Sequence, residues 1–347
     1  MRVLLTTIPG LEDIVVKEIE EKIESLRNIN YKKLSGRIYI SIGKDDKSLL
    51  QKLHELRCIE RVILILGEGE SSKENIDIYL DSELVSKFLG PRMTFMVRSL
   101  RIGEHTFTST DIAAILGKNI QEAIYEKWRF YPEVSLSDPD IIFYIEIVED
   151  VHRWGIDLTG LNALHRRKYR VYVHPSSLNP IIAYCMCRIA RINEKKRILD
   201  PMCGSGTILI EGKYLNPHVK AWGLDINPQH IAGARLNAEE AGVEIKFETA
   251  DIADIDELFP PSFFDAIITN PPFGIREKSI YTLSRLYSLL VEKSKKLLRK
   301  EGILCVLTPR KKLLLNILAK HNFFIEKTFT LRHGGITSFI ITAVKSS

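Results

Sequence analysis

RILDPMCGSGT, residues 197–207, is the stretch of this chain that decides its fold. Four residues of strand character lead into a glycine turn, and the apolar run that begins at Ile208 then predicts a helix. Glycines let the backbone approach a ligand closely, and the first turn of a helix offers free N–H groups. The stretch therefore predicts a strand, turn and helix of an α/β domain that binds a nucleotide-like ligand.

The residues after the glycines narrow the class of ligand. A dinucleotide site needs a third glycine where Leu209 stands, and the Gly-Lys-Ser/Thr of a P-loop is absent. Asp225 instead ends the next predicted strand, Ala221–Asp225, where a carboxylate can bind ribose hydroxyls. Asp251 ends a third predicted strand in the same way. Each aspartate alone is more often a helix cap or a loop residue, but three strand-end carboxylates in order, with Asp200, favour a ligand site.

Asn270-Pro271-Pro272-Phe273 directly follows the apolar run Phe264–Thr269, a predicted buried strand. The prolines end the strand, because neither can donate to a β-ladder and Pro272 restricts its predecessor. An Asn amide, a Pro carbonyl and an aromatic face can accept hydrogen bonds from an exocyclic NH2 group and stack on its ring. A strand followed by an ordinary turn is the alternative.

Composition indicates two or three domains in 347 residues, without a run near the ~18 apolar residues of a membrane span. The polar N-terminus does not resemble a signal peptide, so we expect a soluble, cytoplasmic enzyme. The cysteines are odd in number and lie mostly in apolar runs, which predicts buried free thiols and no metal site. They are Cys58, Cys185, Cys187, Cys203 and Cys305.

Charge differs between the two halves. Residues 1–160 carry 21 Lys+Arg against 27 Asp+Glu, net −6, and residues 161–347 carry 28 against 17, net +11. A basic half that contains the predicted ligand site suits a polyanionic substrate. The densest cluster, between the halves, predicts contact with a phosphate backbone, and a solvated linker is the alternative. It consists of His165, Arg166, Arg167, Lys168, Tyr169 and Arg170.

The acidic half reads as a compact α+β unit. We expect strands at Val3–Thr6, Gly36–Ile40, Glu60–Leu66, Met93–Arg98 and Ile141–Val148, helices at Leu11–Leu26, Ser48–His54, Asp81–Leu89 and Thr110–Lys127, and a polar loop at Gly67–Asn75. From Lys87 to Arg129, basic residues interleave with aromatic ones, which predicts a phosphate-contacting face, although such aromatics are more often core. The residues are Arg92, Arg98 and Arg101 with Phe95, Phe107 and Trp128.

The motifs of the basic half resemble those of Rossmann-fold, S-adenosylmethionine-dependent methyltransferases that act on an exocyclic amine. A strand at Gly302–Thr308 and a closing hairpin at Phe323–Thr328 and Thr337–Val344 agree. The resemblance implies a seven-stranded, mostly parallel sheet with an antiparallel last strand. It also implies that Asn270 to Phe273 (Asn270, Pro271, Pro272, Phe273) hold the target base. It places Asp200, Gly204 and Gly206 around the methionine part of the cofactor, Asp225 at the ribose, and Asp251 with the backbone of Ile252 at the adenine. The other implied cofactor-binding residues are Pro201, Cys203, Ser205, Thr207, Ile226 and Asn270.

The acidic half resembles a ferredoxin-like unit followed by a THUMP domain, an RNA-binding module. The motifs that carry this resemblance are Ile8–Glu12, Leu56–Val62, Val97–His105, Leu136–Asp140 and Asp157–Gly160 with Leu164–Arg170. It implies a ferredoxin-like domain at 1–68, a THUMP domain at 69–156, a basic linker at 157–178 and a methyltransferase domain at 179–347. His105 and Arg276 join the arginines above as predicted RNA contacts.

Together these parts resemble the THUMP-containing enzymes that methylate guanosine 6 in the acceptor stem of tRNA. The resemblance implies S-adenosyl-L-methionine as cofactor, tRNA held at its 3′ end by the THUMP domain, and a monomer without metal or membrane partner. The alternatives are N2-guanine methylation at another tRNA position, such as 10, or in ribosomal RNA, and adenine-N6 methylation. A non-catalytic RNA-binding protein and a nicotinamide dehydrogenase are less favoured readings.

Overall fold

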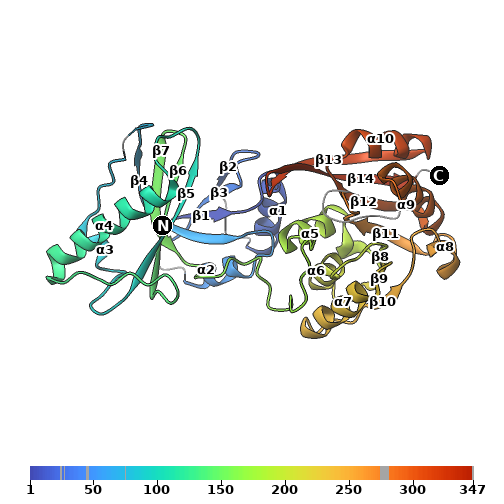
Figure 1. The fold of residues 1–347 in the computed structure, drawn as a ribbon, viewed down its shortest axis with the longest axis horizontal. Coiled ribbons are helices and arrows are strands. Elements are labelled where there is room, and N and C mark those ends of the chain that lie inside the picture. The colour runs from blue at the N-terminus through green and yellow to red at the C-terminus, as the bar shows by residue number, and fades with distance from the viewer. Residues whose placement is uncertain (24–25, 27, 44–46, 75, 274–280, 346–347) are drawn as a thin grey trace.

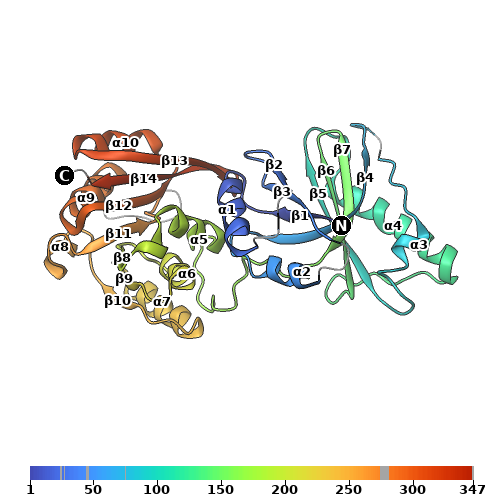
Figure 2. The same cartoon turned by 180° about the vertical axis from the view of Figure 1, so that it is seen from behind.

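The computed structural model describes residues 1–347 except 24–25, 27, 44–46, 75, 274–280 and 346–347. Two units lie end to end in an elongated molecule, and each is built on its own sheet (Figures 1 and 2). Helix α1 of the first unit lies beside α5 of the second, at the junction.

The N-terminal unit contains a sheet of seven strands among the described residues, in the order β2-β3-β1-β4-β7-β6-β5. Neighbouring strands are antiparallel except β5 and β6, which are parallel. The elements are β1 (Arg2–Thr6), α1 (Glu12–Lys22), β2 (Ile29–Tyr31), β3 (Arg37–Ser41), α2 (Lys47–His54), β4 (Arg61–Glu70), α3 (Ser82–Val85), β5 (Phe95–Ile102), α4 (Ser109–Trp128), β6 (Ile141–Val148) and β7 (Val151–Asp157).

The predicted polar loop at Gly67–Asn75 is wrong in its first part, because β4 continues through Gly67 to Glu70. The reason is the partner strand β7, which the sequence reading did not predict: Gly67 to Glu70 pair with its residues Val151–Trp154. Since β4 pairs with both β1 and β7, strands from residues 1–68 and 69–156 belong to one sheet. The domain boundaries stay a prediction.

Helix α4 shows how local sequence fixes an element of this unit. Thr108 and Asp111 form a capping box at its start, and the helix ends at Arg129, which adopts a left-handed backbone conformation. Its buried side chains recur every three or four residues and face the sheet. They are Ile112, Leu116, Ile120, Ala123 and Ile124.

The C-terminal unit contains a second sheet, of seven strands within the described part of the chain, in the order β10-β9-β8-β11-β12-β14-β13. The first five are parallel and β14 is antiparallel to both of its neighbours, which confirms the predicted α/β fold class. The elements are α5 (Pro180–Ile189), β8 (Arg197–Asp200), α6 (Thr207–Leu215), β9 (Lys220–Asp225), α7 (Pro228–Glu240), β10 (Lys246–Thr249), α8 (Ile255–Leu258), β11 (Phe264–Thr269), α9 (Leu283–Leu297), β12 (Leu298–Thr308), α10 (Lys311–Lys320), β13 (Phe323–His333) and β14 (Ile336–Lys345), with a short 3₁₀ turn at Ile192–Glu194.

Both faces of this sheet are covered, which explains why its central strands are apolar throughout. Successive residues point to opposite faces: Ile198 joins the cluster that contains α5, α6 and α7, and Leu199 joins the cluster that contains α8, α9 and α10. All six residues of β11 are buried. Strands β9 and β10 lie on one side of β8 in the sheet, and the next strand in the chain, β11, lies on its other side. A crevice is therefore expected at the carboxyl ends of β8 and β11, where the strand order reverses.

Candidate active site

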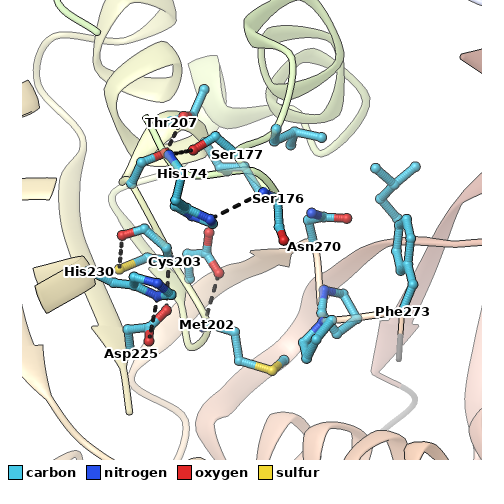
Figure 3. Close-up of a pocket in the computed structure, with 18 of the residues that line it drawn as sticks. His174, Ser176, Ser177, Met202, Cys203, Thr207, Asp225, His230, Asn270 and Phe273 are labelled. Carbon is cyan, nitrogen blue, oxygen red and sulfur yellow. Dashed lines mark hydrogen bonds and ion pairs between the residues drawn. The ribbon is translucent and has the colours of Figure 1, made fainter. Parts of the chain in front are cut away.

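A cavity of about 590 Å³ opens at the carboxyl ends of the parallel strands. Its walls come from the glycine turn after β8, the ends of β9 and β11, and the tip of the β13–β14 hairpin. Figure 3 shows Asp225 and His230 on one side of it and Asn270 and Phe273 on the other. The cavity therefore has two chemically different sides.

The glycine turn that lines the cavity is held in shape by its own hydrogen bonds. Gly204 and Gly206 have φ values of +52° and +76°, a region that favours glycine, and Gly206 N–H donates to the Cys203 carbonyl at 2.8 Å. Asn237 on α7 holds the turn from behind, because its Nδ2 donates to the Ser205 carbonyl at 3.0 Å. The turn is thus fixed before any ligand binds.

Asp225 at the end of β9 is held by three hydrogen bonds. Its Oδ2 accepts from Gly204 N–H at 2.9 Å, and its Oδ1 accepts from Asn227 N–H at 2.9 Å and lies 3.2 Å from His230 Nδ1. The His230 ring stacks on His174, with ring centres 4.5 Å apart and planes 10° from parallel. Since a carboxylate has about four acceptor positions, Asp225 keeps capacity for a ligand hydroxyl.

Asp200 at the end of β8 lies at the bottom of the cavity and is 1% exposed. Burial raises the pKa of Asp200 to about 7, and the charge of Asp225 acts in the same direction. Met202 N–H donates to its Oδ1 at 3.2 Å. The carboxyl group therefore changes charge near neutral pH, which makes its ionisation sensitive to a bound cation.

Asp251 follows β10 and is held by a local turn and a distant tyrosine. Its Oδ1 accepts from Ala253 N–H at 2.9 Å, and the Tyr281 hydroxyl lies 3.1 Å from each of its oxygens. Ile252 beside it lines the cavity with an apolar side chain. This edge suits a flat ring that offers an amine at its rim.

Asn270 follows β11 on the opposite side of the cavity. Its Oδ1 is shielded from solvent and has no hydrogen-bond partner among the described residues. Pro271, Pro272 and Phe273 line the same side, and Phe273 packs partly against the core. A buried acceptor without a donor is costly, so this side is built to receive an N–H or O–H group from a ligand.

The structure brings together nearly all the residues predicted to bind cofactor or base. The cavity is lined by Asp200, Pro201, Cys203, Gly204, Ser205, Thr207, Asp225, Ile226, Asp251, Ile252, Asn270, Pro271, Pro272 and Phe273. Gly206 shapes the turn without lining the cavity. Their roles toward a ligand stay predictions.

The sequence reading missed His174, His230 and Tyr281. His230 lies one helical turn after the Asn227 cap of α7, so its closeness to Asp225 had a local signal. His174 and Tyr281 are brought in by tertiary packing. The hairpin residues Leu331 and His333, which also line the cavity, were expected only as a closing hairpin.

The predicted RNA contacts of the N-terminal unit are partly engaged within the protein. Arg98 Nη1 lies 3.1 Å from Asp157 Oδ2, Arg101 Nη1 donates to the Gly103 carbonyl at 3.2 Å, and His105 Nε2 lies 2.7 Å from the Glu149 carbonyl. Arg92 is exposed. Of the aromatics, Phe95 is core, Phe107 is half-buried and Trp128 is 43% exposed.

The basic cluster also divides into exposed and internal residues. Arg166 and Lys168 are exposed. Arg167 Nε lies 3.3 Å from the buried Glu211 Oε1, and burial lowers the pKa of Arg170. Arg276 lies outside the described residues. RNA binding by all these residues stays a prediction.

The five cysteines are buried and free, as predicted. In the described part of the chain, no group of three His, Cys, Asp or Glu side chains is placed to hold a metal ion. Nor does any helix in that part have both the length and the apolar character of a membrane span.

Comparison with known proteins finds a known domain in each unit. Residues 167–338 match the family described as RMKL-like, methyltransferase domain, and residues 74–152 match the THUMP domain. Two curated relatives are named tRNA (guanine(6)-N2)-methyltransferase. The Archaeoglobus fulgidus protein is 31% identical, over 98% of this chain and 91% of its own. The Methanocaldococcus jannaschii protein is 32% identical, over 96% of this chain and 97% of its own.

The crystal structure of TrmN from Thermus thermophilus is similar along the full length. It has a TM-score of 0.80 and 25% sequence identity, and the similarity covers 99% of each chain. The order of the two units is therefore shared by a solved structure as well as by the relatives.

Proposed function

Since the chain belongs to the family of THUMP-containing tRNA guanine-N2 methyltransferases, we propose that it uses S-adenosyl-L-methionine to methylate N2 of guanosine 6 in tRNA. The observation that carries this chemistry is Asn270 Oδ1, a buried acceptor in the cavity without a partner among the described residues. An exocyclic amine supplies the missing donor.

The cofactor side fits S-adenosyl-L-methionine, which supplies an electrophilic methyl group on a sulfonium sulfur when bound. The Asp200 carboxylate and the turn at Gly204 suit the charged methionine part, and Asp225 has lone pairs left for ribose hydroxyls. Asp251 and the backbone of Ile252 suit the adenine rim. The cofactor side is lined by carboxylates, and its described lining residues include no lysine or arginine. This composition disfavours a phosphate ligand.

On the base side, the guanine amine is a poor nucleophile because its lone pair is delocalised into the ring. Asn270 Oδ1 and the Pro271 carbonyl accept hydrogen bonds from its two N–H groups, which localises the lone pair and stabilises positive charge as it develops on nitrogen. After methyl transfer, one of these protons is released to solvent. Phe273 stacks on the base and holds the amine in line with the methyl group. These residues act by position and polarity, and none has to form a covalent bond.

A guanosine in the acceptor stem is paired, so it must leave the helix to reach this cavity. The unstacking cost, a few kcal/mol, is recovered from the stacking and backbone contacts. The THUMP domain holds the 3′ end of the tRNA at the far end of the molecule, which sets the distance to the modified nucleotide. We propose that one cytoplasmic monomer provides both sites.

Methylation of total tRNA and of ribosomal RNA with methyl-labelled cofactor tests the proposal. We expect N2-methylguanosine as the labelled nucleoside, and mapping of the label to position 6 of tRNA. The Asn270→Ala variant is the control for contaminating activity. Labelled N6-methyladenosine, label in ribosomal RNA alone, or label at another tRNA position such as 10 would contradict the proposed substrate.

A further inference from the structure

A buried carboxylate at the junction of the two units takes no part in the chemistry above. Glu211 lies on α6, is fully buried and does not line the cavity. Its Oε2 accepts from Arg57 Nε at 2.7 Å and its Oε1 accepts from Arg57 Nη2 at 2.8 Å. The Tyr169 hydroxyl donates to Oε1 at 2.8 Å, and Arg167 Nε lies 3.3 Å from it.

These partners come from different parts of the chain. Arg57 precedes β4 in the N-terminal unit, whereas Arg167 and Tyr169 lie between β7 and α5. Arg167 Nη2 donates to the Arg57 carbonyl at 2.8 Å, and the Arg57 guanidinium lies 3.9 Å from the centre of the Tyr214 ring on α6. A two-point guanidinium–carboxylate contact fixes an angle as well as a distance. The N-terminal unit is therefore held in one orientation.

The same unit also touches the wall of the cavity. The Pro9 carbonyl accepts from Arg332 N–H at 3.1 Å. Gly10 has a φ of +103°, and a Cβ there would lie 1.9 Å from the Thr330 carbonyl oxygen. Leu331, the next residue on β13, lines the cavity. The first unit is thus fitted to both the helix after the glycine turn and the hairpin that closes the site.

A small rotation at this junction is enlarged at the far end of the N-terminal unit, where α3 and α4 lie (Figure 1). That unit contains the THUMP domain, which under the proposed function holds the RNA. We propose that Arg57 and Glu211 are positioning residues that fix the orientation of the RNA-holding unit and so select which nucleotide reaches Asn270. This inference rests on the proposed function.

The experiment compares Arg57→Met with Arg37→Met. Arg37 Nε lies 2.7 Å from the buried Glu146 Oε2, so this control removes an ion pair that is at least as buried as that of Arg57 and lies wholly inside the N-terminal sheet. In Arg57→Met we expect the fraction of methyl groups at neighbouring guanosines to rise at least about tenfold, with a lower kcat/KM for tRNA. The Kd for S-adenosylhomocysteine stays within about twofold, because the cofactor side is intact. We expect Arg37→Met to methylate the same nucleotide as the wild type.

Arg57→Lys, which keeps the charge but not the two-point contact, takes the place of Arg57→Met if the latter does not fold. Two native cysteines, one from each unit, report on whether the same junction stays closed. Cys58 Sγ and Cys185 Sγ are buried there and lie 3.3 Å apart. We expect both thiols to react faster with an aromatic disulfide in the Arg57 variants than in Arg37→Met.

Two results are decisive in different ways. If the Arg57 variants methylate the same single nucleotide as Arg37→Met, and their thiols stay equally protected, the positioning role is refuted. If the wild type methylates no tRNA guanosine, the proposed function fails, and thiol protection alone then decides whether Arg57 fixes the junction.

Discussion

The two sides of the cavity differ in how complete they are. On the cofactor side, Asp225 already accepts three hydrogen bonds, and Asp251 is held by Ala253 and Tyr281. On the base side, Asn270 Oδ1 is buried without a partner among the described residues. The carboxylates are held by hydrogen bonds within the C-terminal unit, whereas under the proposed function Asn270 Oδ1 finds a donor only when a substrate binds.

This difference has an energetic meaning. A buried polar group without a partner costs about 1–3 kcal/mol, and that cost is removed by a ligand with an N–H at the right place. Under the proposed function, the base side therefore selects its ligand at one atom, Asn270 Oδ1, whereas the cofactor side binds through several groups that are already held in place. Changes on the two sides should alter different kinetic constants.

The largest effect is expected at Asn270. Asn270→Ala removes the acceptor for the amine, so we expect kcat to fall about 100- to 1000-fold while the Kd for S-adenosylhomocysteine stays within about twofold. Single-turnover methylation and calorimetry measure the two constants. Asn270→Asp, which keeps an acceptor, should retain more activity than the alanine variant. An unchanged rate in Asn270→Ala would sink the assignment of the base side.

An intermediate effect of the opposite kind is expected at Asp225. Asp225→Ala removes an acceptor for the ribose and releases Gly204 N–H, so we expect the cofactor Kd to rise about 10- to 100-fold. At saturating cofactor, kcat should fall less than about tenfold, because the base side is intact. Equilibrium dialysis and initial rates at two cofactor concentrations separate these outcomes. A large loss of kcat with an unchanged cofactor Kd would contradict the assignment of Asp225 to the cofactor side.

The smallest effect is a pH dependence at Asp200. Burial raises the pKa of this carboxyl from its ordinary 3.8 to about 7, so the cofactor-free protein favours the neutral form below about pH 7. A cofactor ammonium group favours the ionised form. Affinity should therefore fall below pH 7, by at most about tenfold per pH unit, and be nearly constant above it.

The same shift has a consequence for stability without cofactor. The folded-state pKa of Asp200 lies above its unfolded value. The stability that the neutral Asp200 carboxyl gives to the folded state is therefore fully present below about pH 4 and is lost as the pH rises through 7. Asp200→Asn should raise the Tm at pH 8 but not at pH 4, and should abolish the pH slope of cofactor affinity. Thermal scans and titrations at pH 5 to 8 test both, and a slope that persists in Asp200→Asn would assign the titration to another group.

Much of the C-terminal unit could be predicted because its signals are local. A strand, two glycines and an aspartate lie within a few residues of one another. Because β8, β9 and β11 are parallel, Asp200, Asp225 and Asn270 at their carboxyl ends come to one edge of the sheet, independently of the loop conformations. The family resemblance rested on those motifs and is confirmed by the relatives and by the full-length structural similarity.

What could not be predicted depends on packing between distant segments. Tyr281 contacts Asp251, and His174 stacks on His230, but no sequence pattern predicts either contact. Strand β7 was missed, and with it the extension of β4, because the polar residue His152 lies on its buried face beside Trp154 and Ile156 and obscures the alternation. Arg167 looked like a surface cation in the sequence, but the buried Glu211 draws it inward.

The place of β14 in the sheet has a consequence for the order of folding. β14 lies between β12 and β13, and it is the later of the two hairpin strands in the chain. When the ribosome has released β13, that strand has no sheet edge to join, and β12 still presents an open one. The cavity wall at Leu331 and the contact between Arg332 and Pro9 must then wait for the final strand. The cavity is complete only after β14 has joined the sheet, so a chain stopped before Ile336 should emerge as an aggregation-prone fragment rather than a slow enzyme.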